Sequence, residues 1–418
     1  MRVLISGAGV AGPTLAWWLS KAGATVTIVE RSSRLLPHGQ NIDIHGTAIT
    51  VANKMGLMDE IRRNNTTEEG TQFIGPDGQP FGLMRMKPGS SASPTSEYKI
   101  LRGDLAAVFH RAVKDMPRVD FRFGTTVNRV ISNDEASVKV ELSDGQVGEY
   151  DLLVAADGQW SKLRKECFPA EAIEVIDYNL FVAYWTMARE AEDNQYWNIY
   201  QGTGARVLQL RPDPYGTIRA AITHMPSTPE QRRDWEEASR SGDKARQADV
   251  LKRDFSGAGW QAERLLNGID GAPDFYFHPI QQIRMKEWSA NRVVCLGDTA
   301  WAPTPLTGSG TTLAILGGYV LAGELAKLSP GEHPGRALKA YDEAFRPFVQ
   351  ATQSFPVWLP RVVHPRSSWR RWLTQAGLAT MVRVVTQPWI IKWIDQPADT
   401  EDYKLPDYTT LEEVAASA

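Results

Sequence analysis

The chain has 418 residues, of which 42% are hydrophobic and 23% charged, and its formal net charge at pH 7 is −3. This length predicts two lobes with sizeable cores, and the slightly acidic balance argues against a general nucleic-acid binder. The two cysteines, Cys167 and Cys295, exclude a disulfide framework and a cysteine-based zinc site, so we expect a cytoplasmic protein in a reducing compartment with no metal centre.

The N-terminus has the pattern of a dinucleotide-binding unit. An apolar strand is expected over residues 3–5, followed by the sequence G-A-G-V-A-G at residues 7–12. A helix over residues 14–21 and a second strand over residues 26–29 complete a strand–helix–strand unit. Removing this segment as a signal peptide would delete the nucleotide site, so we expect it to be retained.

The glycines and the acidic residue of this unit each have a physical role in holding a dinucleotide. Gly7 permits the tight turn, Gly9 lets a pyrophosphate approach the backbone, and Gly12 lets the helix pack on the strand. Glu30 follows the second strand and can accept hydrogen bonds from both ribose hydroxyls. An acid at this position argues against a 2′-phosphate and hence against an NADP pocket. The predicted cofactor-binding residues of this unit are Gly7, Gly9, Ala11, Gly12, Glu30 and Arg31.

Two segments further along the chain, a helix start and a strand–turn–helix connection, are candidates for the same site. Arg102 opens a helix expected to run to about residue 114, where it could reach a pyrophosphate or a flavin edge; a surface arginine at a helix terminus is the alternative. A buried strand over residues 151–156 ends in Asp157-Gly158, a turn signal, and Ser161 could cap the next helix. The alternative for this second joint is a purely structural strand–turn–helix connection.

A third unit lies nearly three hundred residues after the first. The apolar strand 292–298 ends in Asp298, and a proline- and glycine-rich turn leads into a helix expected over residues 311–328. Asp298 could bind ribityl or ribose hydroxyls, and the helix N-terminus could stabilise negative charge on a reduced flavin. The alternative is a buried structural helix. The predicted cofactor-binding residues here are Asp298, Pro305, Gly308, Gly310 and Thr311.

Two such units far apart indicate one cofactor held from both ends, which favours FAD over NAD. Residues 299–323 carry no charge and are long enough to span a bilayer, but their prolines, glycines and hydroxyl residues favour a buried cofactor helix.

The segment between residues 168 and 279 changes pattern. Strands rich in aromatic and branched residues are expected, with two helices after them. The expected strands are 181–187, 196–200, 206–210 and 217–222, and the expected helices are 230–239 and 244–255. Tyr184, Trp185, Trp197 and Tyr200 are candidates to line a substrate cavity; since side chains alternate along a strand, only one of each adjacent pair can face it. Core packing is the alternative for each.

A phenolic substrate would gain from a catalytic base, and His45 and His224 are the candidates, with a structural or surface role as the alternative for each. Residues 344–394 contain no acidic residue and interleave arginines with tryptophans. Such a segment could lie on a membrane surface or help to bind an anionic substrate, but we favour C-terminal helices docked on the FAD-binding lobe.

The three units, in this order and spacing, resemble the class A flavin monooxygenases of the para-hydroxybenzoate hydroxylase type. That family has a G-x-G-x-x-G start, a D-G motif followed by Ser and Arg, and a G-D motif followed by P-x-x-G-x-G, which this chain has at residues 7–12, 157–164 and 297–310. Arg102 matches the family's R-x-x-L arginine, and residues 39–46 resemble the loop that passes the flavin in the tetracycline-degrading branch. Trp301 departs from the histidine that is frequent in the family.

The resemblance implies an α/β fold with a Rossmann-like FAD-binding domain, an inserted β-sheet substrate domain and a C-terminal helical region. The implied FAD-binding domain is residues 1–75, 100–175 and 280–330, the substrate domain is 76–99 and 176–279, and the C-terminal helices and tail are 331–418.

The resemblance also implies chemistry. FAD would be bound non-covalently and reduced by NAD(P)H, and a C4a-hydroperoxyflavin would transfer one oxygen atom from O2 to an aromatic or polycyclic small molecule. The rivals to this monooxygenase reading are a flavin oxidase or dehydrogenase that inserts no oxygen, and a non-catalytic binding protein on the same scaffold.

Overall fold

The computed structural model describes residues 1–35, 39–89, 95–387, 389–390, 400–409 and 411–412. A six-stranded sheet has β1 near its middle, in the order β17-β18-β11-β1-β2-β7. All neighbours in it are parallel except β17 and β18. Its strands are β1 (Arg2–Ser6), β2 (Thr25–Glu30), β7 (Val119–Phe123), β11 (Leu152–Ala155), β17 (Ser289–Ala290) and β18 (Val293–Cys295).

The parallel pairing explains why the three sequence units meet. The carboxyl ends of β1, β2, β11 and β18 lie at one edge of the sheet, and each sequence motif begins where one of these strands ends. Ligands bind at this edge in open α/β sheets. Residues separated by almost three hundred positions are thereby brought into one site.

Helices cover this sheet. The helix α10 (Gly310–Ala326) packs between α1 (Ala11–Lys21) and α11 (Gly335–Thr352), and its side chains are buried on every side, as an all-apolar helix requires. A Cβ at Gly318 would lie 3.0 Å from Thr14 Cγ2, so a glycine there lets the two helices come close together. The other helices of this lobe are α2 (Thr47–Lys54), α3 (Met58–Arg63), α4 (Arg102–Val113), α5 (Lys162–Cys167) and α9 (Asp298–Trp301).

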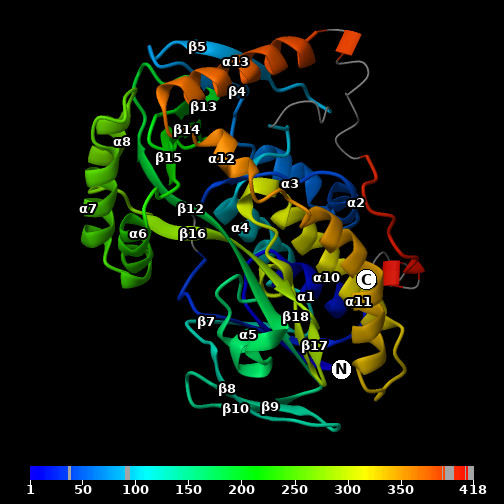
Figure 1. Ribbon diagram of the computed structural model, residues 1–418. Helices are drawn as coiled ribbons and strands as arrows, with labels where there is room; N and C mark the ends of the chain where they lie inside the picture. Colours follow the sequence, from blue (N-terminus) through cyan, green and yellow to red (C-terminus); the bar gives the residue numbers. More distant parts are fainter. Residues whose placement is uncertain (36–38, 90–94, 388, 391–399, 410, 413–418) are drawn as a thin grey trace.

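A seven-stranded sheet forms the second lobe, in the order β16-β12-β15-β14-β13-β4-β5. Its strands are β4 (Gly70–Ile74), β5 (Pro80–Arg85), β12 (Ile173–Ala188), β13 (Tyr196–Gln201), β14 (Arg206–Pro212), β15 (Thr217–His224) and β16 (Tyr276–Met285). Its outer face is covered by α6 (Pro229–Ser241), α7 (Lys244–Phe255) and α8 (Ala262–Gly268). The long strands β12 and β16 run from this sheet toward the first lobe (Figure 1).

Two small sheets complete the fold. The strands β8 (Val127–Asn133), β9 (Val138–Leu142) and β10 (Val147–Tyr150) form an antiparallel sheet at the end of the first lobe, and β3 (Asn41–Ile42) pairs with β6 (Ile100–Leu101). The short 3-10 helices are η1 (Ala170–Ala172) and η2 (Pro305–Thr307). Because β4 pairs with β13, the chain joins the second lobe at residue 70. The sequence placed this boundary five residues later, at residue 75.

The C-terminal helices divide between the two lobes. The helix α11 packs on α10 as expected, whereas α13 (Ser368–Val385) lies along β5 of the second lobe, so docking of the whole segment on the FAD-binding lobe was wrong. Between them, α12 (Leu359–Val363) is fixed by His364, whose Nε2 lies 2.7 Å from Thr223 Oγ1 on β15. The physical reason is that β5 is an edge strand that α13 covers.

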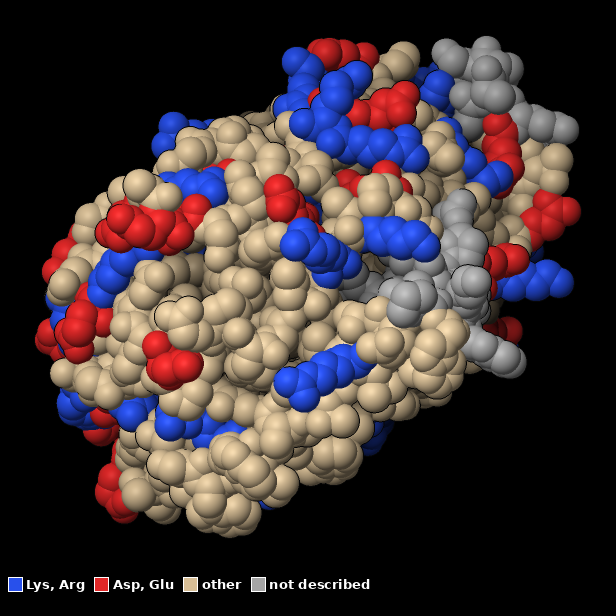
Figure 2. All heavy atoms as spheres, turned by 90° about the horizontal axis from the view of Figure 1, so that it is seen from above, with Lys and Arg blue, Asp and Glu red and all other residues tan. Residues whose placement is uncertain are grey.

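The face seen from above is mainly uncharged at its centre, with Lys and Arg as well as Asp and Glu side chains around it (Figure 2). Trp369 and Trp372 of α13 are 63% and 70% exposed. Within the part of the chain that the structure describes, no helix has both the length and the apolar character needed to cross a membrane.

Candidate active site

A cavity of about 720 Å³ lies between the two lobes, at the edge where the parallel strands end. Its walls come from the glycine loop after β1, the start of α4, the turn before α10 and the inner face of the seven-stranded sheet. The predicted cofactor residues that line it are Gly9, Ala11, Arg102, Asp298, Pro305, Gly308, Gly310 and Thr311. One cavity thus contains residues from the first and third units together with Arg102.

The glycines of the first unit differ in what surrounds them. A Cβ on Gly7 would lie 2.3 Å from Ala156 O, and one on Gly12 would lie 2.2 Å from Gly7 O, so both positions are closed by backbone. A Cβ on Gly9 would meet nothing within 4 Å. Gly7 and Gly12 therefore set the shape of the turn, while Gly9 leaves the backbone open to a ligand, as the approach of a pyrophosphate requires.

Glu30 lies at the end of β2, beside the glycine loop. Its Oε2 accepts a hydrogen bond from the Ala8 N–H at 3.0 Å, and its Oε1 accepts one from the Ser32 N–H at 2.9 Å. The neighbouring Arg31 is exposed. Neither side chain lies on the wall of the cavity, and Glu30 is placed by the loop rather than by another side chain.

Asp298 and Arg102 both lie on the cavity wall. The expected strand 292–298 ends at Cys295, because Gly297, with φ 68° and ψ −147°, turns the chain into α9, which begins at Asp298. The carboxylate is accessible from the cavity but is otherwise enclosed by protein. This burial raises the pKa of Asp298 above its ordinary value, and the Arg102 guanidinium acts in the opposite direction.

The turn before α10 is shaped by backbone with positive φ. Gly308 has φ 68°, and Thr304 has φ 71°, which is unusual for a residue with a side chain. Thr304 lines the cavity, and its buried Oγ1 has no hydrogen-bond partner among the described residues. Such backbone strain is concentrated at functional sites. Nothing in the local sequence marks Thr304, so it was not among the predicted site residues.

The middle unit joins the other two. Ser161 caps α5 as predicted, accepting a hydrogen bond from the Arg164 N–H at 3.0 Å. Buried Arg164 donates to Thr299 O at 2.8 Å, and the Gly158 N–H donates to Thr299 Oγ1 at 2.9 Å. Asp157 lies beside the cavity, with its Oδ1 3.4 Å from Thr299 Oγ1. This unit holds the start of α9, and hence Asp298, in place.

The four aromatic substrate candidates divide between the two faces of the seven-stranded sheet. Tyr184 and Trp197 line the cavity, and burial raises the pKa of Tyr184 to about 12. Trp185 and Tyr200 are 1% and 2% exposed in the core under α6–α8, so as cavity residues they were wrong. The cause is the alternation of side chains along β12 and β13.

The two histidine candidates also separate. His45 lines the cavity, with its Nδ1 3.4 Å from Thr312 Oγ1. His224 was a wrong candidate for a base, because its neighbour Thr223 faces the cavity and His224 therefore points to the opposite face of β15. Its ring centroid lies 4.8 Å from that of Trp235, and burial lowers its pKa to about 4.

Three cations that were not predicted as site residues also lie on the cavity wall: Lys99, Arg211 and Arg219. Arg219 lies within the predicted strand 217–222, and Arg211 lies one residue past the predicted strand 206–210, in the part of β14 that the sequence did not predict. A charged residue at an inward position of a buried strand was the signal that could have revealed Arg219.

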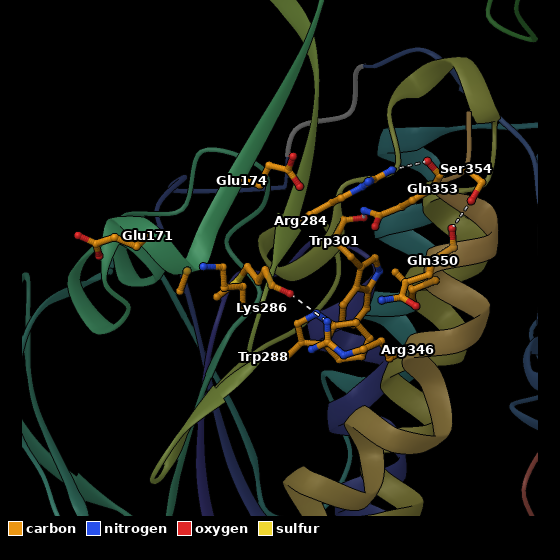
Figure 3. Close-up of a pocket in the computed structure, with 13 residues that line it drawn as sticks. Glu171, Glu174, Arg284, Lys286, Trp288, Trp301, Arg346, Gln350, Gln353 and Ser354 are labelled. Carbon is orange, nitrogen blue, oxygen red and sulfur yellow. Dashed lines mark hydrogen bonds between the residues drawn. The ribbon is translucent and has the colours of Figure 1, made fainter. Parts of the chain in front are cut away.

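A second cavity, of about 760 Å³, lies between the end of β16 and α11 (Figure 3). Arg346 lies over the Trp288 ring at 4.3 Å and donates to Met285 O at 2.9 Å, and Arg284 donates to Gln353 O at 3.0 Å. Trp301, at the far end of α9 from Asp298, also lines it. The motif residues lie in the first cavity, and we place the active site there.

Comparison with known proteins assigns the chain to a family. The model of the FAD binding domain family matches residues 1–355. Monooxygenase CTB7 of Cercospora beticola is 34% identical over 421 residues, covering 97% of this chain and 97% of the relative. The FAD-dependent monooxygenase asL4 of Sarocladium schorii is 32% identical over 438 residues, covering 98% of this chain and 99% of the relative.

Solved structures agree with the fold. The crystal structure of the tetracycline destructase Tet(55) superposes with a TM-score of 0.77 at 25% identity, covering 97% of this chain and 98% of that one. The cavity between the lobes, the three motifs at the end of a parallel sheet and the relatives that match along the whole chain lead to one conclusion: this chain belongs to the FAD-dependent monooxygenases of the FAD binding domain family, and it is an oxidoreductase with FAD as its cofactor.

Proposed function

We propose that this enzyme uses NAD(P)H and O2 to hydroxylate or epoxidise an aromatic or other electron-rich small molecule. The observation that carries the proposal is the continuity of one cavity, which runs from Gly9 and Asp298 to Tyr184 and Trp197. The same cavity is thereby lined both by cofactor motifs and by aromatic side chains.

The residues of the cavity fit FAD. The open backbone at Gly9 would hold the pyrophosphate, and Asp298 the ribityl hydroxyls. Glu30, which lies beside the glycine loop and outside the cavity wall, would hold the ribose. The N-terminus of α10, entered through Gly308 and Gly310, supplies N–H groups that would stabilise negative charge on the reduced ring. When bound, FAD supplies the redox chemistry with O2, and the protein contributes positioning and shielding.

Part of the cavity wall near the seven-stranded sheet is apolar. Tyr184 and Trp197 supply aromatic surface, and Ala220, Ala221 and Ile280 supply aliphatic surface. Apolar surface of this kind would limit the access of water, which promotes side reactions of reactive intermediates. His45 is the histidine on this wall, and it is the candidate base that the cavity retains.

The relatives support an aromatic or polycyclic substrate. Tet(55) is a destructase named for tetracycline, a polycyclic compound, and it covers nearly the whole chain. Family membership argues against the non-catalytic alternative, because this chain matches CTB7 and asL4, which are named monooxygenases, over almost their whole length.

The test is an isotope experiment on the flavin-loaded enzyme. Polycyclic phenols are screened for accelerated oxidation of NADH and NADPH, and the products of active compounds are analysed by mass spectrometry after reaction under oxygen-18 gas. We expect one labelled atom per product molecule and none from labelled water. Stoichiometric hydrogen peroxide with an unlabelled product would instead establish the rival flavin oxidase.

A further inference from the structure

We propose that α13 holds this enzyme on the surface of an anionic lipid bilayer, with its exposed tryptophans in the headgroup region. The inference concerns where the enzyme works, and it does not depend on the reaction proposed above. It rests on two properties of α13: an apolar stripe that faces away from the protein, and arginines beside that stripe that pair with no described carboxylate.

One side of α13 packs on the rest of the protein. Gln375 and Val382 are the buried residues of this helix, and a separation of seven positions places them on one face. A Cβ on Gly82 of β5 would lie 3.5 Å from Val382 Cγ2, so this face covers β5. Figure 1 shows α13 at the top of the second lobe, beside β5. This face of the helix therefore already has a partner within the molecule.

A second apolar stripe, the outer stripe, runs along the other side of α13. Its members are large apolar side chains that are each at least 46% exposed: Trp369, Trp372, Leu373, Met381 and Val384. Successive residues of an α-helix are about 100° apart, so the centre of the outer stripe is turned by roughly 180° from the face of Gln375 and Val382. The helix thus has two apolar faces, of which the protein covers one.

The outer stripe is more than a set of scattered surface residues. Trp369 and Trp372 are 63% and 70% exposed, and Leu373 beside them is 57% exposed. Residues three and four positions apart are neighbours on a helix surface, so these three side chains form a continuous apolar area. Contiguous exposed apolar surface with polar residues around it marks a site of interaction with another molecule or with a membrane.

Positive charge lies along both edges of the outer stripe. Arg370 and Arg383 are exposed and flank it on opposite sides, and the Arg370 guanidinium lies 5.3 Å from the centroid of the Trp369 ring. Residues 344–394 contain no acidic residue. No carboxylate among the described residues pairs with any of the arginines in and around α13, which are Arg361, Arg366, Arg370, Arg371 and Arg383. Negative charge to balance them has to come from another molecule.

An anionic bilayer matches both the stripe and the charge. Tryptophan is favoured at the level of the lipid headgroups, because its ring is largely apolar and its N–H can still donate a hydrogen bond. Arginines at the edges of the stripe would lie among the anionic headgroups, with their aliphatic stems toward the apolar side. A helix with this distribution of residues lies in the plane of the membrane surface.

Two other partners fit less well. A second copy of this chain, docked stripe to stripe about a twofold axis, would bring the same arginines together across the interface. A nucleic acid would neutralise the arginines but would leave the apolar stripe without a matching surface. Charge and apolar surface together therefore favour the lipid surface.

The test measures co-sedimentation of the flavin-loaded enzyme with lipid vesicles. One set of vesicles is an equal mixture of phosphatidylglycerol and phosphatidylcholine, and the other is phosphatidylcholine alone. We expect partition into the anionic vesicles to be roughly tenfold stronger than into the neutral ones. We also expect it to weaken as the salt concentration rises, because salt screens exposed charges.

The main variant is Trp369→Ser with Trp372→Ser. Both side chains are exposed, so flavin content and thermal unfolding should match wild type while partition into anionic vesicles falls by about tenfold. Arg370→Gln with Arg383→Gln should instead reduce the preference for anionic over neutral vesicles. The control is Trp160→Ser, which removes a tryptophan that is 53% exposed outside α13 and should bind vesicles as wild type does.

Three results would each overturn the inference: enzyme that stays in the supernatant with anionic vesicles, equal partition into the two kinds of vesicle, or unchanged partition of the tryptophan variant. A dimer in solution that the tryptophan variant dissociates would assign the outer stripe to a second copy of the chain and would also overturn it. These measurements involve no turnover, so a product without oxygen-18 would count against the proposed function alone.

Discussion

Arg164 and Thr299 connect the motif after β11 to α9. The buried Arg164 guanidinium donates to Thr299 O at 2.8 Å, and its second terminal nitrogen donates to Gln159 O at 2.7 Å. The motif after β11 thereby holds α9, whose first residue is Asp298. A side chain outside the cavity wall thus positions one that lies on it.

Replacing Arg164 with Met should lower the free energy of unfolding by about 3 kcal/mol, since two buried carbonyl groups lose charged donors. It should also weaken FAD binding through Asp298. Urea denaturation and flavin titration measure the two effects. Lys165→Met, on the exposed side of the same helix, is the control, and equal stability of the two variants would contradict this role for Arg164.

Gly9→Ala and Gly12→Ala should fail in different ways. At Gly12 a Cβ would lie 2.2 Å from Gly7 O, so the variant should unfold at a lower temperature whether or not FAD is present. At Gly9 the Cβ meets no protein atom, so the apoprotein should keep its stability and lose FAD affinity by roughly tenfold, or about 1.4 kcal/mol. Thermal unfolding of the apoprotein and flavin content separate the two, and a Gly9→Ala variant with normal flavin content would disprove the assignment of the pyrophosphate.

Tyr184→Leu and Trp185→Leu test which face of β12 borders the cavity. Trp185 is 1% exposed in the core, so its replacement should cost about 3 kcal/mol of stability. Tyr184→Leu should change the free energy of unfolding by less than about 1 kcal/mol, as for a residue on a cavity wall. It should, however, alter substrate affinity. The opposite ranking in chemical denaturation would reverse the assignment of the two faces.

His224 and His364 should make stability depend on pH. Burial lowers the pKa of each to about 4, below the ordinary value of 6.5, so the unfolded chain binds more protons between these values. Their contribution to the free energy of unfolding is complete above pH 6.5 and declines as the pH falls toward 4, by about 1.4 kcal/mol per histidine at pH 5.5.

The measurement for this prediction compares urea denaturation at pH 7.5 and pH 5.5 in wild type and in His224→Asn. Other titrating groups contribute equally to both proteins, so the difference between their pH dependences isolates His224. An unchanged pH dependence in the variant would show that His224 does not resist protonation in the folded state.

The sequence determined the elements that depend on local pattern. Three such elements depend on backbone geometry within a few residues: the glycine turn at residues 7–12, the apolar strand before Asp157 and the uncharged helix after Gly310. The structure has these elements close to the expected bounds. Because parallel strands end at one edge, local motifs were enough to indicate a single dinucleotide site and its family.

Only the tertiary structure decided which faces meet. Alternation required that Tyr184 and Trp185 point apart, but which of them faces the cavity depends on the helices α6–α8 that cover the other side. The register of β14 with β15, set by long-range pairing, places Arg211 beside Arg219, and no local pattern predicts that pair. The cofactor could be inferred from local sequence because it contacts backbone turns, whereas the substrate end is formed by side chains that only the folded sheet brings together.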